Sequence, residues 1–225
     1  LPIYDATLRA FPRSLVANGT GLVAGENLLP LAVGSGAVFI AHAFDDEIQK
    51  RIAGRAPTVG HVGDAMGDGF LVAGSVLGLF VTGQLVPAVR FREVTFDLMQ
   101  GLVINSVLTS IVKLSVGRER PDSTNSRSFP SGHTSTSVML ATVLGSHLGP
   151  RVAIPAAALA AFVGASRIEH NRHYVSDVVA GATLGYVVGR TVTAHVRRDG
   201  GSERRVTVYP VASPDACGVL LTFRW

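Results

Sequence analysis

Six long stretches of the chain are almost free of charged residues. Within each stretch the apolar residues cover every side of a helix rather than one stripe, which is the pattern of a helix that is buried on all sides or faces lipid. The sequence therefore predicts an all-α core, a bundle of six helices at residues 28–44, 69–89, 98–112, 134–150, 152–166 and 178–196, the last interrupted by Arg190.

The lengths of these stretches bear on whether they cross a membrane. About 20 apolar residues are needed to span a bilayer. Only residues 69–89 clearly reach that length, and the others would need flanking residues or locally thin lipid. With the N-terminus inside, eleven Lys and Arg fall on the inner side and nine on the outer side, a slight preference for that orientation. We expect a transmembrane bundle, and a soluble periplasmic bundle is the alternative.

Glycine recurs every four residues in two of the stretches. Gly74 and Gly78 form one series, and Gly181, Gly185 and Gly189 form the other. Small residues at this spacing let two helix backbones approach closely in lipid, and they serve tight packing in a soluble bundle equally well. We expect tight helix contacts at both series.

The C-terminal end has a different composition. Residues 197–204 are polar and contain glycine, which is typical of a linker. Residues 205–211 and 219–225 are rich in β-branched and aromatic residues and are separated by a turn sequence, which favours a β-hairpin. The expected organisation is a helical domain at residues 1–200 with a small hairpin appendage at residues 201–225.

The overall composition narrows the class of protein. Charged residues make up 16% of the chain and apolar residues 47%, whereas a typical soluble domain has about 25% charged residues. Intrinsic disorder is therefore excluded. A net charge of +4 spread along the chain is a weak footprint for a nucleic-acid backbone, so no nucleic-acid partner is expected. The single Cys217 excludes a disulfide framework and a cysteine-rich metal site.

Three short polar blocks interrupt the apolar stretches, each at a predicted helix end. The first runs from Lys113 to Pro121. Gly117 and Pro121 are predicted to end the preceding helix near Val116. Lys113 and Arg120 would then flank a turn and could converge on one anion. Alternatively, these cations simply complement the dipole of the helix C-terminus.

The second block is Pro130-Ser131-Gly132-His133. Ser131 is a favourable N-cap for the helix that follows, and the first N–H groups of such a helix form an anion site. Gly132 lets a ligand approach the backbone. His133 would then lie beside the anion, where it can donate a proton. By itself this sequence is also an ordinary helix cap.

The third block contains Arg167, His173 and Asp177. His173 and Asp177 share a helix face if the helix begins before His173, and the carboxylate can then bond one ring nitrogen and leave the other as a base or nucleophile. Arg167 offers a guanidinium fork that suits phosphate. Two alternatives remain open. One is a surface His–Asp pair, and the other is a metal site at His170 and His173, for which no third ligand has a recognisable spacing.

Together the three blocks predict a single phosphate pocket. It would contain three cations, the N–H donors of a helix, one histidine as an acid and one histidine backed by a carboxylate. Such a pocket can hold a tetrahedral phosphate and transfer it to an imidazole without a metal.

The order and spacing of the blocks resemble the three-part signature of the type 2 phosphatidic acid phosphatase (PAP2) superfamily. The matching residues are Lys113-x6-Arg120-Pro121, Pro130-Ser131-Gly132-His133 and Ser166-Arg167-x5-His173-x3-Asp177. Every signature position is filled, and the six apolar stretches resemble the six-helix core of the membrane branch. The C-terminal hairpin lies outside the resemblance.

The resemblance implies a role for each residue. His173 would be the nucleophile that forms a phosphohistidine, oriented by Asp177, and His133 would protonate the leaving alkoxide and later activate water. No metal and no cofactor would be needed. The implied substrate is a lipid phosphomonoester or pyrophosphate, hydrolysed at the extracytoplasmic face of the inner or plasma membrane. The phosphate oxygens would be bound by Lys113, Arg120, Ser131, Gly132 and Arg167.

Three other functions fit parts of the pattern. A soluble periplasmic acid phosphatase of the same superfamily fits the short apolar stretches. A vanadium haloperoxidase would hold vanadate where the phosphatases hold phosphate, although such chains are typically much longer. A non-catalytic phosphate- or lipid-binding protein would need the cations but neither His133 nor the pair of His173 and Asp177. The lipid phosphatase is therefore the leading hypothesis.

Overall fold

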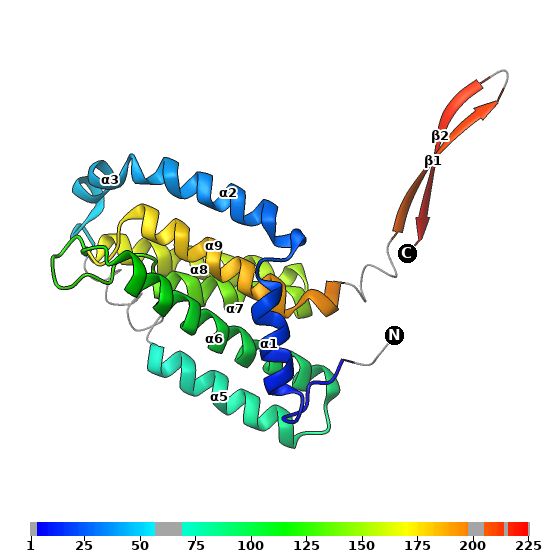
Figure 1. The fold of residues 1–225 in the computed structure, drawn as a ribbon, viewed down its shortest axis with the longest axis horizontal. Helices are drawn as coiled ribbons and strands as arrows, with labels where there is room; N and C mark the ends of the chain where they lie inside the picture. The colour runs from blue at the N-terminus through cyan, green and yellow to red at the C-terminus, as the bar shows by residue number, and fades with distance from the viewer. Residues whose placement is uncertain (1–3, 57–68, 198–204, 214–215, 225) are drawn as a thin grey trace.

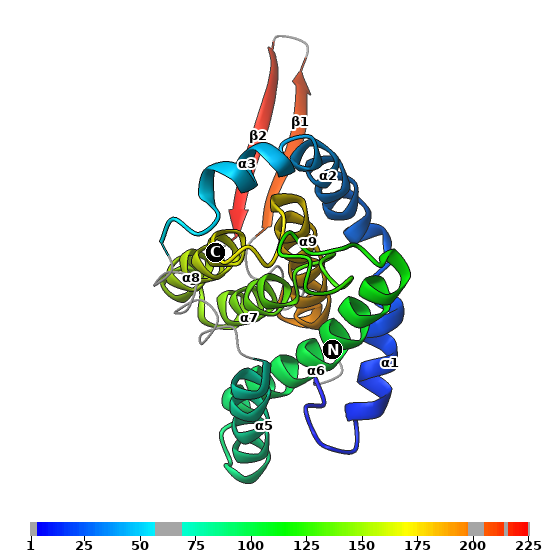
Figure 2. The ribbon, with the colours of Figure 1, turned by 90° about the vertical axis from the view of Figure 1, so that its left-hand side faces the viewer.

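The computed structural model describes residues 4–56, 69–197, 205–213 and 216–224. Its helices are α1 (Phe11–Gly21), α2 (Gly25–His42), α3 (Asp45–Ile52), α5 (Gly69–Leu85), α6 (Val89–Val116), α7 (Gly132–Leu148), α8 (Pro150–Glu169) and α9 (Val175–Val192). Helices α6, α7 and α9 lie side by side at the centre of the molecule, with α2 against α9, α5 against α6 and α8 against α7 (Figures 1 and 2).

The predicted bundle of six helices is incomplete. Each of the six uncharged stretches overlaps a helix, but α1 and α3 are further helices of the described chain. A search for uncharged stretches misses α3 because five of its eight residues are charged. Its acidic residues lie in the first turn and its basic residues in the last turn, where they complement the helix dipole. The six-helix count is therefore wrong.

The helices that are long and apolar enough to cross a membrane differ from the prediction. In the described chain they are α6, with 28 residues, and α8, with 20 residues, and α1 and α2 add a third span if the pair, bent by 57°, crosses as one unit. Helix α5, at 17 residues, is shorter. Large apolar side chains such as Phe39 and Ile154 are 79% and 71% exposed, as expected for surfaces that face lipid. These features support membrane association.

One of the two glycine series makes a tight helix contact. A Cβ atom added to Gly185 would lie 2.1 Å from the carbonyl oxygen of Ser135, and one added to Gly181 would lie 2.4 Å from that of Ser131. The backbones of α9 and α7 therefore meet directly along this series. Among the residues that the structure describes, no atom lies within 4 Å of a Cβ atom added to Gly74 or Gly78 of α5, so this part of the structure shows no tight contact at that series.

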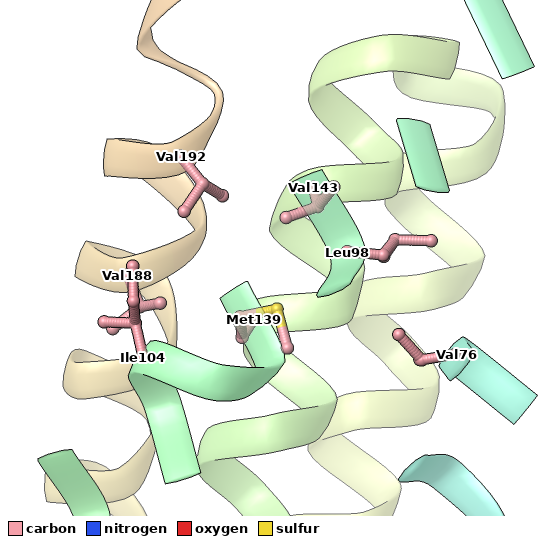
Figure 3. Packing of buried hydrophobic residues seen from close by; sticks show 7 residues of the cluster. All are labelled: Val76, Leu98, Ile104, Met139, Val143, Val188 and Val192. Atoms are coloured by element: carbon pink, nitrogen blue, oxygen red, sulfur yellow. The ribbon is translucent and has the colours of Figure 1, made fainter. Parts of the chain in front are cut away.

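The main apolar core fills the space between α5, α6, α7 and α9 (Figure 3). Met139 is its centre, fully buried and packed against Gly101 of α6, where a Cβ atom would lie 2.6 Å from the Met139 sulfur. This core packs α6, α7 and α9 against one another. Its buried members are Val76, Leu98, Ile104, Met139, Val143, Val188 and Val192.

Two strands follow the helices, in the segments whose sequence favours a hairpin. They are β1 (Arg205–Ser213) and β2 (Ala216–Arg224), which pair antiparallel from Arg205 opposite Arg224 to Ser213 opposite Ala216. Residues 198–204, which make up most of the expected linker, lie outside the described residues.

Candidate functional site

The three polar blocks come together at one end of the bundle, the left-hand end in Figure 1. They occupy the end of α6, the beginning of α7 and the connection between α8 and α9. Gly117 ends α6 in a left-handed conformation, and its N–H group donates to the carbonyl of Lys113. Ser131 is the N-cap residue of α7. Both predictions of helix ends are thus confirmed.

His173 approaches Asp177 in a different way from the one predicted. Helix α9 begins at Val175, so His173 precedes the helix and the predicted shared helix face is wrong. Asp177 lies in the first turn, where its Oδ2 atom accepts a hydrogen bond from the backbone N–H of Tyr174 at 2.9 Å. The same oxygen lies 3.7 Å from Nδ1 of His173. The backbone N–H of His173 donates to the carbonyl of Arg167 at 3.2 Å, which fixes it to the end of α8.

Asp177 is the centre of the hydrogen-bond network. Its Oδ1 atom accepts from Nη1 of Arg118 at 2.8 Å and its Oδ2 atom from Oγ of Ser128 at 2.5 Å. Its backbone carbonyl accepts from the N–H of Ser131 at 2.9 Å. Burial raises the pKa of the Asp177 carboxyl, but the hydrogen bonds and the charge of Arg118 outweigh it and hold the pKa below its usual range. The carboxylate is therefore ionised and fixed in orientation.

Arg118 and Asp45 belong to this network and were not predicted. Arg118 donates to Oδ2 of Asp45 at 2.8 Å and to Oγ of Ser176 at 2.7 Å, and its guanidinium group lies 4.1 Å from the ring centre of Tyr174. Asp45, at the start of α3, is buried and accepts the N–H of Ser176 at 2.9 Å. Arg118 lies inside the first block, but the sequence analysis gave it no role. No local sequence pattern indicates that Asp45, which is 73 residues away, is its partner.

The predicted phosphate-binding cations are positioned by different contacts. Nζ of Lys113 donates to the backbone carbonyls of Arg127 and Pro130 at 2.8 and 2.6 Å. Nε of Arg120 donates to Oδ1 of Asn125 at 3.1 Å. Arg167 is 3% exposed. The loop after α6 therefore holds two of the cations and the end of α8 holds the third.

His173 is a neutral imidazole at neutral pH. It is 1% exposed, and burial lowers its pKa to about 4, because desolvation and the charges of Lys113 and Arg120 outweigh the attraction of Asp177. A neutral ring leaves a nitrogen lone pair available for attack on an electrophile.

The second block borders a cavity of about 280 Å³ between α5, α6 and α7. Gly132 and His133 line it, with polar atoms from Asn105 and Thr109. A Cβ atom on Gly132 would lie 3.7 Å from Thr109, so packing within the protein leaves room for a side chain there. Ser131 is fully buried, and its Oγ accepts a hydrogen bond from Thr134 at 3.0 Å.

The metal alternative for the third block finds no support among the described residues. No group of three or more His, Cys, Asp or Glu side chains with ligand atoms close together includes His170 or His173.

A family model and several known proteins match parts of the chain, and the family model covers the three blocks. The model described as PAP2 superfamily matches residues 95–200. A lipid A 1-phosphatase of Porphyromonas gingivalis is 40% identical over 92 residues, which are 40% of this chain and 21% of that protein. A lipid A 1-phosphatase of Rhizobium etli is 32% identical over 99 residues, covering 37% and 42% of the two chains. The chain thus matches less than half of the length of these relatives.

Two solved structures share the fold. LpxE of Aquifex aeolicus has a TM-score of 0.54 at 20% identity and covers 68% of this chain and 93% of its own. A transmembrane PAP2 type phosphatidylglycerolphosphate phosphatase of Bacillus subtilis has a TM-score of 0.50 at 21% identity, covering 84% and 97%. Residues 95–200, which contain the three signature blocks, therefore match the PAP2 superfamily, and the fold is similar to those of these two structures.

Proposed function

We propose that this chain hydrolyses a phosphomonoester or pyrophosphate of a membrane lipid through a phosphohistidine intermediate. The observation that carries the proposal is the buried, neutral His173 with the ionised Asp177 on its Nδ1 side, at 3.7 Å. The negative charge of Asp177 at this distance favours the tautomer with the proton on Nδ1, so that Nε2 would carry the lone pair that attacks phosphorus.

In the first step Nε2 of His173 attacks the phosphorus atom in line with the lipid oxygen. A P–N bond forms as the P–O bond to the lipid breaks, and His133 donates a proton to the departing alkoxide. The imidazole becomes cationic as the bond forms, and Asp177 stabilises that charge. The products of this step are the free lipid and phosphorylated His173.

In the second step water attacks the phosphohistidine. His133, now neutral, takes a proton from the water molecule, the P–N bond breaks and inorganic phosphate leaves. His173 and His133 return to their starting states, so that the net reaction consumes one water molecule. Lys113, Arg120 and Arg167 bind the oxygens of the phosphoryl group in both steps, where they offset its spread negative charge.

The substrate class is argued from the relatives and from the helices. The two relatives described above are lipid A 1-phosphatases, and the helices have the length and apolar character of membrane spans. A phosphorylated lipid headgroup would reach the site from the bilayer, with the site on the extracytoplasmic side. A glycolipid 1-phosphate is the first substrate to test, followed by phosphatidate, phosphatidylglycerophosphate and isoprenyl pyrophosphate.

The test measures phosphate release by the purified chain in detergent with EDTA present. We expect metal-independent release by the wild type, and loss of release in His173→Ala. Wild-type protein mixed briefly with radiolabelled substrate should carry an acid-labile, alkali-stable label, and the variant should carry none. Release that survives in His173→Ala would overturn the covalent mechanism. Release that requires a metal would overturn the proposed chemistry.

A matched pair of variants on α8 tests the phosphate-binding role. Arg167→Lys keeps the charge but replaces a two-pronged fork by a point charge, so we expect strongly reduced kcat/KM. Arg151→Lys, an exposed position on the same helix, should leave kcat/KM unchanged. Equal kinetics in the two variants would mean that Arg167 does not bind the phosphate.

A further inference from the structure

A second cluster of titratable side chains lies at the other end of the helical bundle. Asp97 precedes Lys113 by sixteen residues of α6, which separates them by about 24 Å at the rise of an α-helix. His147 is in the last turn of α7, and His195 follows α9. The proposed phosphatase chemistry uses none of these residues.

Both histidines direct the same ring nitrogen at one carboxylate oxygen. Nε2 of His147 lies 2.8 Å and Nε2 of His195 lies 3.5 Å from Oδ2 of Asp97. Asp97 is fully buried, and the side chains of His147 and His195 are 7% and 19% exposed. The three ligand atoms all lie within 4.8 Å of one another. The cluster therefore has the ligand types and the spacing of a small cation site.

These distances are close to those of a tetrahedral metal centre. Two ligand atoms bound at about 2.1 Å and at the tetrahedral angle lie about 3.4 Å apart. The contact of His195 with Asp97 already has this length, and that of His147 is shorter by less than about 1 Å. Nε2 of His195 is buried and has no hydrogen-bond partner among the residues that the structure describes. A cation between the three atoms would satisfy it.

The surroundings of Asp97 also resemble the outer shell of a metal site. The hydroxyl of Tyr4 donates to Oδ1 of Asp97 at 2.5 Å, which leaves Oδ2 to face the histidines. The ring of Tyr4 stacks on that of His195 with centres 3.6 Å apart. Glu93, one helical turn before Asp97, adds a negative charge that acts on Tyr4 and His195. Outer partners of this kind orient metal ligands and strengthen their binding.

We propose that Asp97, His147 and His195 form a binding site for one divalent transition-metal ion of the Zn²⁺ class. Two imidazoles and one carboxylate are ligands that Zn²⁺ prefers over Mg²⁺ or Ca²⁺. Water would fill the fourth position. The ion would tie α6 and α7 to the segment after α9, far from the proposed phosphate chemistry, so its role would be structural.

The test measures metal binding directly. The full chain is purified in detergent, stripped with a chelator and titrated with Co²⁺ and Zn²⁺, with visible absorption of Co²⁺ and metal content as the readouts. We expect one ion per chain and the absorption of a four-coordinate Co²⁺ centre. His147→Gln and His195→Gln should abolish that absorption, and Tyr4→Phe should weaken binding by about 10- to 100-fold.

His42→Gln is the matched control. His42 also contacts a carboxylate, that of Asp45 at 2.9 Å, but no third ligand joins the pair among the described residues. This variant should bind Co²⁺ as the wild type does. The melting temperature of the metal-free His195→Gln protein is compared with that of the metal-free wild type. Similar values will show that the variant is folded and that the loss of metal binding is not caused by unfolding. Absence of stoichiometric binding in the wild type, or equal binding in His195→Gln, would overturn the proposal and leave a hydrogen-bonded cluster.

Discussion

Asp177 receives hydrogen bonds from Arg118, Ser128 and the backbone of Tyr174, and its own carbonyl binds Ser131. A single residue therefore joins the beginning of α7 to the beginning of α9 and places its carboxylate 3.7 Å from His173. The sequence was sufficient to predict that His173 and Asp177 lie close together, because they are four residues apart in one polar block. It was not sufficient to find Asp45, because a partner that is distant in sequence leaves no mark in local spacing.

The pKa of His173 gives a prediction at the residue scale. Burial lowers it to about 4, against an ordinary value near 6.5. The ring should therefore stay neutral as the pH falls from 7 to 5, and it should take up a proton only near pH 4. NMR titration of ¹⁵N-histidine protein, with the signal assigned from His173→Ala, measures this directly. Protonation near pH 6.5 would contradict the burial of the ring.

The same shift has a consequence for stability. Between pH 6.5 and pH 4 the unfolded chain binds a proton at His173 that the folded chain does not bind. The contribution of this group to the free energy of unfolding is therefore lost progressively as the pH falls through that window.

Arg118 is predicted to be a positioning residue. Arg118→Lys keeps one charge but cannot reach Asp45, Ser176 and Asp177 together. Each buried acceptor left unpaired costs about 1–3 kcal/mol, so we expect kcat to fall by about tenfold or more while KM changes little. Arg51→Lys, in an exposed pair with Glu47, is the control and should retain wild-type kinetics. A rise in KM with unchanged kcat would instead indicate that Arg118 binds substrate.

At the scale of the elements, the uncharged stretches predicted where six helices lie better than they predicted which helices are long enough to span a membrane. The six uncharged stretches all became helical, since a run without charges can be buried on every side. The search for uncharged stretches missed α3 and underestimated the length of α6, because charged residues occur in α3 and in the first turns of α6. α6 extends to Val89 through Arg90, Arg92 and Glu93, which a search for uncharged stretches excludes.

The two glycine series provide a prediction at this scale. Gly185→Ala places a methyl group against the carbonyl oxygen of Ser135, and overpacking of this kind costs about 1–3 kcal/mol. We expect a clearly lower melting temperature in detergent. Gly78→Ala has the same chemistry in a helix with open space around it, so its melting temperature should equal or exceed that of the wild type. Equal melting temperatures in both variants would mean that α7 and α9 do not meet as described.

At the scale of the whole molecule, many large apolar side chains are exposed, as expected of a protein that lies in a membrane. Exposed apolar side chains occur on α2, α5, α6 and α8, including Leu29, Leu71, Leu114 and Ile154. Soluble monomers seldom expose large continuous apolar areas. The low charge content predicted this property from the sequence. The charge content could not predict which helices are long enough to cross a membrane, because helix ends are set by packing against neighbouring helices.

Membrane extraction tests this description. We expect the chain to remain in the membrane pellet after treatment with alkaline carbonate or high salt, and to be released by detergent. A peripheral protein held by charge would be released by salt. Release by carbonate would overturn the assignment of α6 and α8 as spanning helices.

The direct contact of α7 and α9 has a consequence for substrate selection. Backbone atoms meet backbone atoms at Gly181 and Gly185, so no side chain along this line can change rotamer to widen or narrow the gap. The beginnings of the two helices, which hold Ser131 and Asp177, therefore keep the same spacing whichever lipid tail lies outside the bundle. For the proposed lipid phosphatase, recognition of the headgroup would therefore be mechanically separate from accommodation of the tail, and tail preference would change through the outer helices α5 and α8.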